Sequence, residues 1–159
     1  MEVKHILKYL RRTKEMFLVY GGEEELVGKC YVDASFYTDP DDSKSQSRYV
    51  FIMNGGVLSW RSSKQSVVAG SITEAEYVAA SKAASEAVWR KAFITELGVV
   101  PSASDPMVIY CDNNGAIANA KELRSHQKGK HIKRRFHSIR EHVKEGDVNI
   151  CKIHTDLNV

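Results

Sequence analysis

The stretch SITEAEYVAASKAASEAVWRKAFITEL, residues Ser71 to Leu97, decides the fold of this chain. It is rich in alanine and glutamate and contains neither glycine nor proline, and Gly98 follows it as a typical left-handed helix cap. Ser71 and Glu74 have the spacing of a capping box, which marks a helix start. The stretch therefore predicts one long helix, and strand patterns on both sides of it predict the sheet against which it packs.

Three strand-like runs precede this helix and two follow it, at 26–36, 48–53, 57–61, 107–111 and 148–153. Asn54-Gly55-Gly56 predicts the turn that joins the second and third runs as an antiparallel hairpin. Two shorter helical patterns separate the last two strands, at 113–121 and 132–143. The predicted order is β-β-β-α-β-α-α-β, and the economical architecture is an α/β fold with a mixed sheet flanked by helices.

The composition indicates one main domain. A chain of 159 residues can bury about two thirds of its unfolded surface, so it does not need disulfides for stability. The three cysteines fall in strand-like runs without paired or metal-type spacing, which favours buried thiols in a reducing compartment. No apolar run approaches the roughly 18 residues of a membrane span, so we expect a soluble chain with no membrane partner.

The first 22 residues have a pattern of their own. Apolar residues recur there at helical spacing, namely Val3, Ile6, Leu7 and Leu10. Gly21-Gly22 then breaks the pattern. We therefore predict a helix and linker over residues 1–22 and the main domain over residues 23–159. Nothing in the pattern requires the first helix for the core, so it fits the end of a preceding domain in a longer polyprotein.

Three carboxylates stand at positions from which strands or helices could present them to one site. Asp33 interrupts the first strand-like run, where aspartate is disfavoured, and Asp112 closes the fourth. Glu76 lies near the start of the long helix. Asp112 could instead cap the short helix that follows it, and Glu76 could be an early-turn carboxylate favoured by the helix dipole.

Helical geometry singles out Glu76. At 100° per residue, Glu76 shares the small, apolar face that includes Ile72, Ala79 and Leu97, whereas Glu74 points roughly 160° away. A carboxylate directed at a sheet is costly unless a cation or a hydrogen-bond donor compensates it. If the three carboxylates converge, Mg²⁺ or Mn²⁺ is the natural countercharge, and two such ions suit the hydrolysis of a phosphodiester.

Basic residues concentrate late in the chain, whereas the net charge is only +3. Residues 121–140 hold eight lysines and arginines against one acid. The candidates for contact with nucleic-acid phosphates are Lys130, Lys133, Arg134 and Arg135. A solvated helix face is the alternative interpretation of the same residues. His154 is a further candidate, as a proton shuttle or as a polar residue at a strand end.

Several short motifs along the chain match those of one protein family in both order and spacing. They are Tyr31-Val-Asp-Ala-Ser-Phe36, Leu58-Ser-Trp60, Thr73-Glu-Ala-Glu-Tyr77, Tyr110-Cys-Asp-Asn113, Lys130-His-Ile132 and His137-Ser-Ile-Arg140. In this order they resemble the ribonuclease H domain at the end of copia-type retrotransposon polyproteins. The resemblance runs from about residue 3 to the last residue.

The resemblance implies a ribonuclease H-like fold with a five-stranded mixed sheet. It also implies an acidic site in which Asp33, Glu76 and Asp112 bind two Mg²⁺ or Mn²⁺ ions and cut the RNA strand of RNA/DNA hybrids during reverse transcription. Residues 1–22 resemble the end of a reverse transcriptase region, which would be a partner in the same polyprotein. The implied location is intracellular, in a cytoplasmic virus-like particle or in the nucleus.

The chain departs from the family pattern at its end and at Arg48, where a glycine is usual. The family carries a fourth acid in an Ala-Asp pair after the last strand, followed by a final helix, whereas this sequence stops at His154-Thr-Asp-Leu-Asn-Val159. Asp156 precedes the expected position and does not match it. Two hypotheses remain: an active metal-dependent endoribonuclease, or an inactive retrotransposon-derived remnant that keeps the fold and weak nucleic-acid binding.

Overall fold

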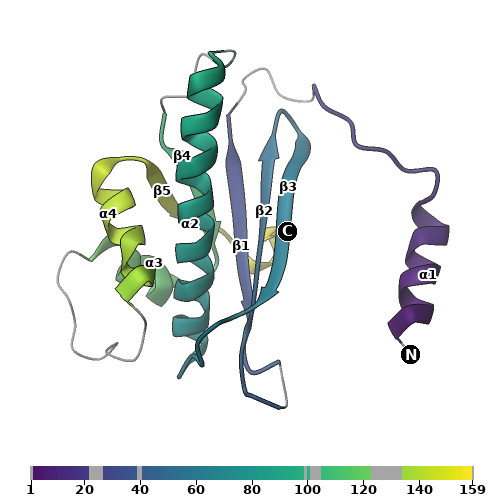
Figure 1. Ribbon diagram of the computed structural model, residues 1–159, viewed down its shortest axis with the longest axis horizontal. Coiled ribbons are helices and arrows are strands. Elements are labelled where there is room, and N and C mark those ends of the chain that lie inside the picture. Colours follow the sequence, from purple (N-terminus) through teal and green to yellow (C-terminus); the bar gives the residue numbers. More distant parts are fainter. Residues whose placement is uncertain are drawn as a thin grey trace.

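A computed structural model describes residues 2–21, 27–38, 41–98, 100, 105–122 and 134–158. Its helices and strands follow the predicted order (Figure 1). In chain order they are α1 (Glu2–Thr13), β1 (Lys29–Ser35), β2 (Gln46–Met53), β3 (Gly56–Lys64), α2 (Ile72–Leu97), β4 (Met107–Cys111), α3 (Asn114–Lys121), α4 (Ser138–Glu145) and β5 (Val148–Lys152). Two short 3-10 helices complete them, η3 (Arg134–His137) and η4 (Thr155–Leu157).

The five strands form one mixed sheet in the order β3-β2-β1-β4-β5. Neighbours β1, β2 and β3 pair antiparallel, whereas β4 pairs parallel to both β1 and β5. The β2–β3 turn has Asn54 at φ 51° and Gly55 at φ 75°. Positive φ at two successive turn residues is the geometry that Asn-Gly favours in tight hairpins. The prediction of a mixed sheet flanked by helices is thus confirmed.

Helix α2 packs lengthwise on this sheet, with α3 and α4 beside it (Figure 1). Its buried side is built of alanines, including Ala79, Ala83 and Ala87, which let the helix backbone approach the strands closely. Phe51 and Ile109 are among the larger side chains that fill the core between helix and sheet. This close packing holds Glu76 of α2 near the ends of β1 and β4.

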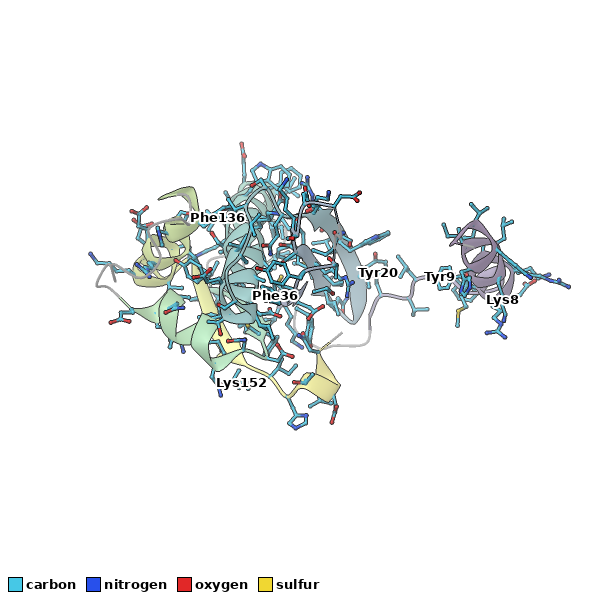
Figure 2. The ribbon with its side chains drawn as sticks, turned by 90° about the horizontal axis from the view of Figure 1, so that it is seen from below. Lys8, Tyr9, Tyr20, Phe36, Phe136 and Lys152 are labelled. Carbon is cyan, nitrogen blue, oxygen red and sulfur yellow. The ribbon has the colours of Figure 1, made fainter. Side chains whose placement is uncertain are left out.

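Helix α1 stands apart from the sheet in both views (Figures 1 and 2). Its apolar residues Val3, Ile6, Leu7 and Leu10 are 55–69% exposed. The chain meets the sheet only later, where the Tyr20 hydroxyl donates to the Val57 carbonyl at 2.7 Å. The expectation that this segment is dispensable for the core agrees with these exposures. The proposed boundary itself stays a prediction.

Candidate metal site at the ends of two parallel strands

Asp33 and Asp112 come to the same edge of the sheet because their strands are parallel neighbours. The last register pair between β1 and β4 is Tyr31 with Tyr110. Each aspartate follows two residues later in its own strand direction. The two carboxylates therefore belong to adjoining strand ends, as the sequence analysis expects of a shared site.

Glu76 reaches this edge from the second turn of α2. It is 4% exposed, and its Oε1 accepts a hydrogen bond of 3.0 Å from the backbone N–H of Ala34, the residue after Asp33. Its Oε2 is buried and has no hydrogen-bond partner among the described residues. A buried carboxylate oxygen without a partner is costly, and a cation at this position would remove that cost.

Electrostatics link Glu76 to both aspartates. The pKa of Glu76 rises from 4.5 to about 8, chiefly because burial disfavours the charged form. The negative charges of Asp33 and Asp112 raise the pKa further, while the hydrogen bond from Ala34 lowers it. The three carboxylates thus repel one another, and a divalent cation is the countercharge that would let them ionise together.

Of the three carboxylates, two form a compact group with potential ligand atoms within 4.8 Å of one another. These are Glu76 and Asp112, together with the Cys111 thiol. Burial raises the pKa of Cys111 to about 12, so the neutral thiol contributes packing rather than charge. The hard oxygen ligands of this group suit Mg²⁺ or Mn²⁺.

Asp33 faces a different countercharge. Its Oδ2 lies 3.4 Å from Nη1 of Arg48, the residue directly opposite it on β2. Sequence reasoning noted Arg48 only as a departure from the family pattern, because the cross-strand register that brings the two together is not visible in the sequence. An arginine at this position competes with any cation for Asp33.

The capping roles at the site are now assigned to other residues. Asn113 caps α3, since its Oδ1 accepts from the Ala116 N–H at 3.0 Å, so Asp112 is not needed as the cap. Ser71 caps α2 by accepting from the Glu74 N–H at 3.2 Å. Glu74 in turn accepts from the Gly70 N–H at 2.7 Å, a structural role at the helix start. Asp112 thereby remains available as a ligand.

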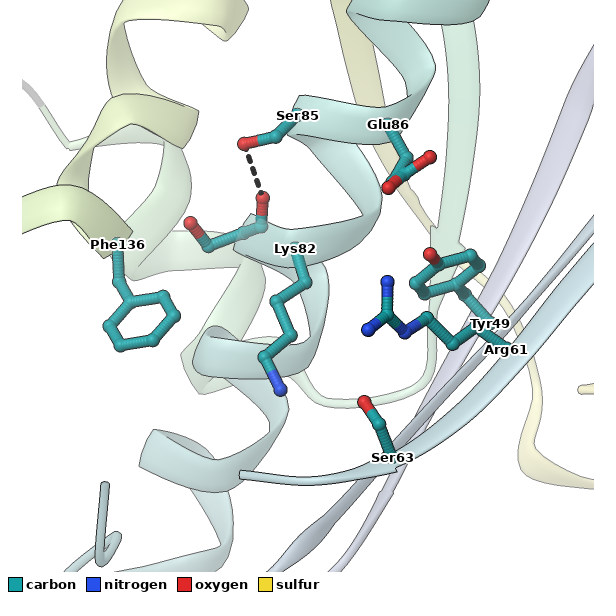
Figure 3. A pocket seen from close by; sticks show the side chains of 8 residues that line it. Tyr49, Arg61, Ser63, Lys82, Ser85, Glu86 and Phe136 are labelled. Atoms are coloured by element: carbon teal, nitrogen blue, oxygen red, sulfur yellow. Dashed lines mark hydrogen bonds between the residues drawn. The ribbon is translucent and has the colours of Figure 1, made fainter. Parts of the chain in front are cut away.

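A cavity of about 350 Å³ lies between α2, β3 and η3. The side chains of Arg61 and Lys82 project into it from two different elements, close to the hydroxyl of Ser63 (Figure 3). Ser81, another residue of its lining, follows Glu76 by five residues, which is about 7.5 Å along the helix. Two cations beside hydroxyl groups suit an anion such as a phosphate. Sequence reasoning missed this pair because the two residues are far apart in the chain.

The predicted nucleic-acid contacts fall mostly outside what the structure describes. Lys130 and Lys133 lie outside the described residues. Arg134 and Arg135 begin η3, and only their backbone is described. All four stay predictions. Phe136 and Ile139, which belong to the helical pattern at 132–143, are buried in the core.

The remaining candidates have simpler surroundings. Tyr77 and His137 share a hydrogen bond of 3.0 Å between the hydroxyl and Nδ1, and burial lowers the pKa of His137. His154 is largely exposed, and its Nδ1 lies 3.4 Å from Oδ2 of Asp156. Its role as a proton shuttle stays a prediction.

Cys30, Cys111 and Cys151 are free thiols. In the described part of the chain, no helix is long and apolar enough to cross a membrane.

Known proteins give two kinds of match. The chain is 42% identical over 156 residues to the retrovirus-related Pol polyprotein of transposon TNT 1-94 from Nicotiana tabacum. The matched region covers 98% of this chain and 11% of that polyprotein. It is 36% identical over 155 residues to the corresponding polyprotein of transposon RE2 from Arabidopsis thaliana, covering 96% of this chain and 10% of that polyprotein. The chain thus spans about a tenth of the length of these relatives. No family profile matches it.

Solved structures identify the fold. LC11-RNase H1, isolated from compost by a metagenomic approach, superposes with a TM-score of 0.58 at 16% identity and covers 83% of this chain and 87% of that chain. The chain is related to retrotransposon Pol polyproteins and has the ribonuclease H fold. RNase H1 from the halophilic archaeon Halobacterium salinarum NRC-1 has the same fold. It superposes on this ribonuclease H-like chain with a TM-score of 0.52 at 14% identity, and the match covers 82% of this chain and 88% of the archaeal chain.

Proposed function

We propose that this ribonuclease H-like domain hydrolyses the RNA strand of RNA/DNA hybrids with two Mg²⁺ or Mn²⁺ ions bound by Asp33, Glu76 and Asp112. The observation that carries the proposal is that Glu76 has a buried Oε2 without a hydrogen-bond partner among the described residues, and that a carboxylate oxygen of Glu76 lies within 4.8 Å of one of Asp112. The residues fit the ions, since carboxylate oxygens are the ligands that these cations prefer. When bound, such ions supply a nucleophile at neutral pH and stabilise charge in an in-line displacement at phosphorus.

The chain's own contribution is to hold the carboxylates in place before any ion arrives. Glu76 has one oxygen held by the Ala34 N–H, and its other oxygen is buried without a hydrogen-bond partner among the described residues. Asp112 follows a buried strand, and its backbone carbonyl accepts a hydrogen bond from the Lys152 ammonium. Side chains that start from packed strands and a packed helix lose little freedom on binding an ion, which favours affinity.

Removing Arg48 should strengthen Mg²⁺ binding. Its ion pair with Asp33 is about half exposed, and exposed pairs contribute about 0.2–1 kcal/mol. Arg48→Ala is therefore expected to tighten Mg²⁺ binding by about 1.4- to fivefold in a calorimetric titration. Arg11→Ala, which removes the same charge from α1, serves as the control. An unchanged affinity in Arg48→Ala would show that the guanidinium does not compete for the site.

Hybrid binding is the next part of the proposal. A neighbour of the same fold, LC11-RNase H1, has been solved in complex with an RNA/DNA hybrid, with a TM-score of 0.56 at 13% identity. In this chain the Arg61 and Lys82 cavity lies one to three turns of α2 beyond Glu76, so a strand that crosses the carboxylates can place another phosphate there. Lys130, Lys133, Arg134 and Arg135 are proposed to add contacts of the same kind.

Lys82→Ala should weaken hybrid binding in a salt-dependent way. Each lost phosphate contact is expected to reduce the slope of log affinity against log salt by about 0.7–0.9. Fluorescence anisotropy of a labelled hybrid at several salt concentrations measures that slope. Lys8→Ala, on the distant α1, should leave the slope unchanged (Figure 2). Equal slopes for Lys82→Ala and wild type would remove the cavity from the proposed interface.

An inactive, retrotransposon-derived remnant remains the second candidate. The contact between Arg48 and Asp33 favours it, because that arginine offers Asp33 a countercharge other than a metal ion. A hybrid labelled separately on each strand distinguishes the two. The enzyme proposal expects Mg²⁺-dependent shortening of the RNA strand alone, whereas binding without cleavage supports the remnant.

Because the relatives are polyproteins, we also propose that the domain works beside a reverse transcriptase domain inside the cell, in a cytoplasmic particle or in the nucleus.

A further inference from the structure

A second group of metal-ligating side chains lies at the turn between α4 and β5, separate from the carboxylates of the proposed active site. It consists of His142 and Glu145 near the end of α4 and Asp147 just before β5. One potential ligand atom from each residue lies within 4.8 Å of those of the other two. The proposed hydrolysis assigns no role to any of them.

The backbone fixes this arrangement. Helix α4 ends at Gly146, whose φ of 78° is left-handed, and its N–H donates to the Val143 carbonyl at 3.3 Å. The next N–H, of Asp147, donates to the His142 carbonyl at 3.0 Å and so folds Asp147 back over the helix end. The Asp147 carbonyl accepts from the Met107 N–H at 3.1 Å, which ties the turn to β4. The three side chains therefore meet because of the fold.

The ring of His142 offers a nitrogen that could bind a metal ion. Its Nδ1 is buried and unpartnered among the described residues. It lies 3.8 Å from Oδ2 of Asp147, which is longer than a hydrogen bond. Zinc bonds of about 2.0–2.2 Å in a tetrahedral site set two ligand atoms about 3.4 Å apart. A small inward movement would thus bring both atoms onto one ion.

The charges around the group are mixed. The negative end of α4 and the two carboxylates favour a cation. Lys91 on α2 opposes it, because its ammonium lies 3.5 Å from Oδ1 of Asp147. That contact uses one oxygen of Asp147 and leaves Oδ2 directed toward His142. Lys91 is expected to weaken metal binding without blocking it.

We propose that His142, Glu145 and Asp147 bind a transition-metal dication, for which Zn²⁺ is the best match. An imidazole nitrogen with two carboxylates suits zinc better than Mg²⁺ or Ca²⁺, which take oxygen ligands. Three protein ligands leave a fourth position for water or another small ligand. Bound Zn²⁺ joins the end of α4 to the start of β5 and stabilises that corner of the domain. The site is independent of the proposed hydrolysis.

Zinc titration of the Glu76→Gln variant tests the proposal, since that change weakens the other candidate metal group. Calorimetry is expected to show one Zn²⁺ per chain at this site. At about 100 times the dissociation constant, Zn²⁺ should raise the melting temperature by about 5–11 °C. His142→Gln in the same background should weaken binding at least tenfold, and Lys91→Met should tighten it. His154→Gln is the matched control, because His154 also faces an aspartate but belongs to no group of three ligands among the described residues.

A second ligand variant separates loss of Zn²⁺ binding from poor folding. If His142→Gln folds poorly, which its melting curve without metal reveals, Glu145→Gln replaces it, since Glu145 is exposed. Loss of Zn²⁺ binding in either variant, with retention in His154→Gln, supports the site. Absence of binding in the Glu76→Gln parent, or undiminished binding in both ligand variants, overturns it. None of these readouts depends on nuclease activity, so failure of the proposed function would leave the result unchanged.

Discussion

Glu76→Gln is expected to slow Mg²⁺-dependent cleavage of an RNA/DNA hybrid by at least about 100-fold. Glutamine fills the same space and can still accept the hydrogen bond from Ala34, so the fold should persist. It cannot supply the negative charge that helps to hold the ions. Losing the several kcal/mol of charge stabilisation that bound ions provide corresponds to a rate loss of this size or larger. Single-turnover cleavage of hybrid labelled in its RNA strand measures the effect.

Glu74→Gln is the matched control for this experiment. It makes the same chemical change two residues earlier, at a carboxylate that accepts a hydrogen bond from the Gly70 N–H at the helix start. Its cleavage rate should stay close to that of the wild type. If both glutamine variants lose activity equally, helix stability rather than ion binding explains the loss. Full activity in Glu76→Gln would remove Glu76 from the proposed site.

The second large effect concerns pH and stability in the absence of metal ions. Burial raises the pKa of Glu76 from 4.5 to about 8, so folding favours its protonated form. The stability from this group is fully present below pH 4.5, and it is lost as the pH rises toward 8. At about 1.4 kcal/mol for each pH unit, the ceiling for this loss is about 5 kcal/mol.

Urea unfolding of wild type and Glu76→Gln at pH 5 and pH 8, with a chelator present, measures this linkage. The stability of Glu76→Gln relative to wild type should increase by about 2–4 kcal/mol between the two pH values, because glutamine does not titrate. Mg²⁺ should reduce that difference at pH 8, since the ion binds the ionised carboxylate. Parallel pH profiles for the two proteins would contradict the burial of an ionisable carboxyl group.

Local sequence patterns predicted the parts of the fold that depend on local chemistry. Residues 71–98 predicted α2 with its cap at each end, and Asn54-Gly55 predicted the hairpin turn. Helical periodicity also distinguished Glu76, which is buried, from Glu74. It did not show where the sheet ends, so Ile72 and Leu97 share the predicted inward face and yet are 58% and 54% exposed.

The parts that sequence patterns missed depend on contacts between distant segments. Arg48 meets Asp33 through cross-strand register, which the long connection between β1 and β2 leaves open in the sequence. Arg61 on β3 and Lys82 on α2 line one cavity because the fold brings these two segments to the same place, and His142 meets Asp147 because a left-handed turn folds the chain back. None of these juxtapositions has a periodic signal that a single sequence reveals.

Asp33, Glu76 and Asp112 are proposed to belong to one divalent-ion site. Calorimetric titration of Mg²⁺ into wild type, Asp33→Asn, Glu76→Gln and Asp112→Asn tests it most directly. We expect measurable binding by the wild type and at least about tenfold weaker binding in each variant, since every ligand that bears charge contributes to a shared site. Mg²⁺ affinity that survives unchanged in all three variants, or that is absent from the wild type, would contradict the claim.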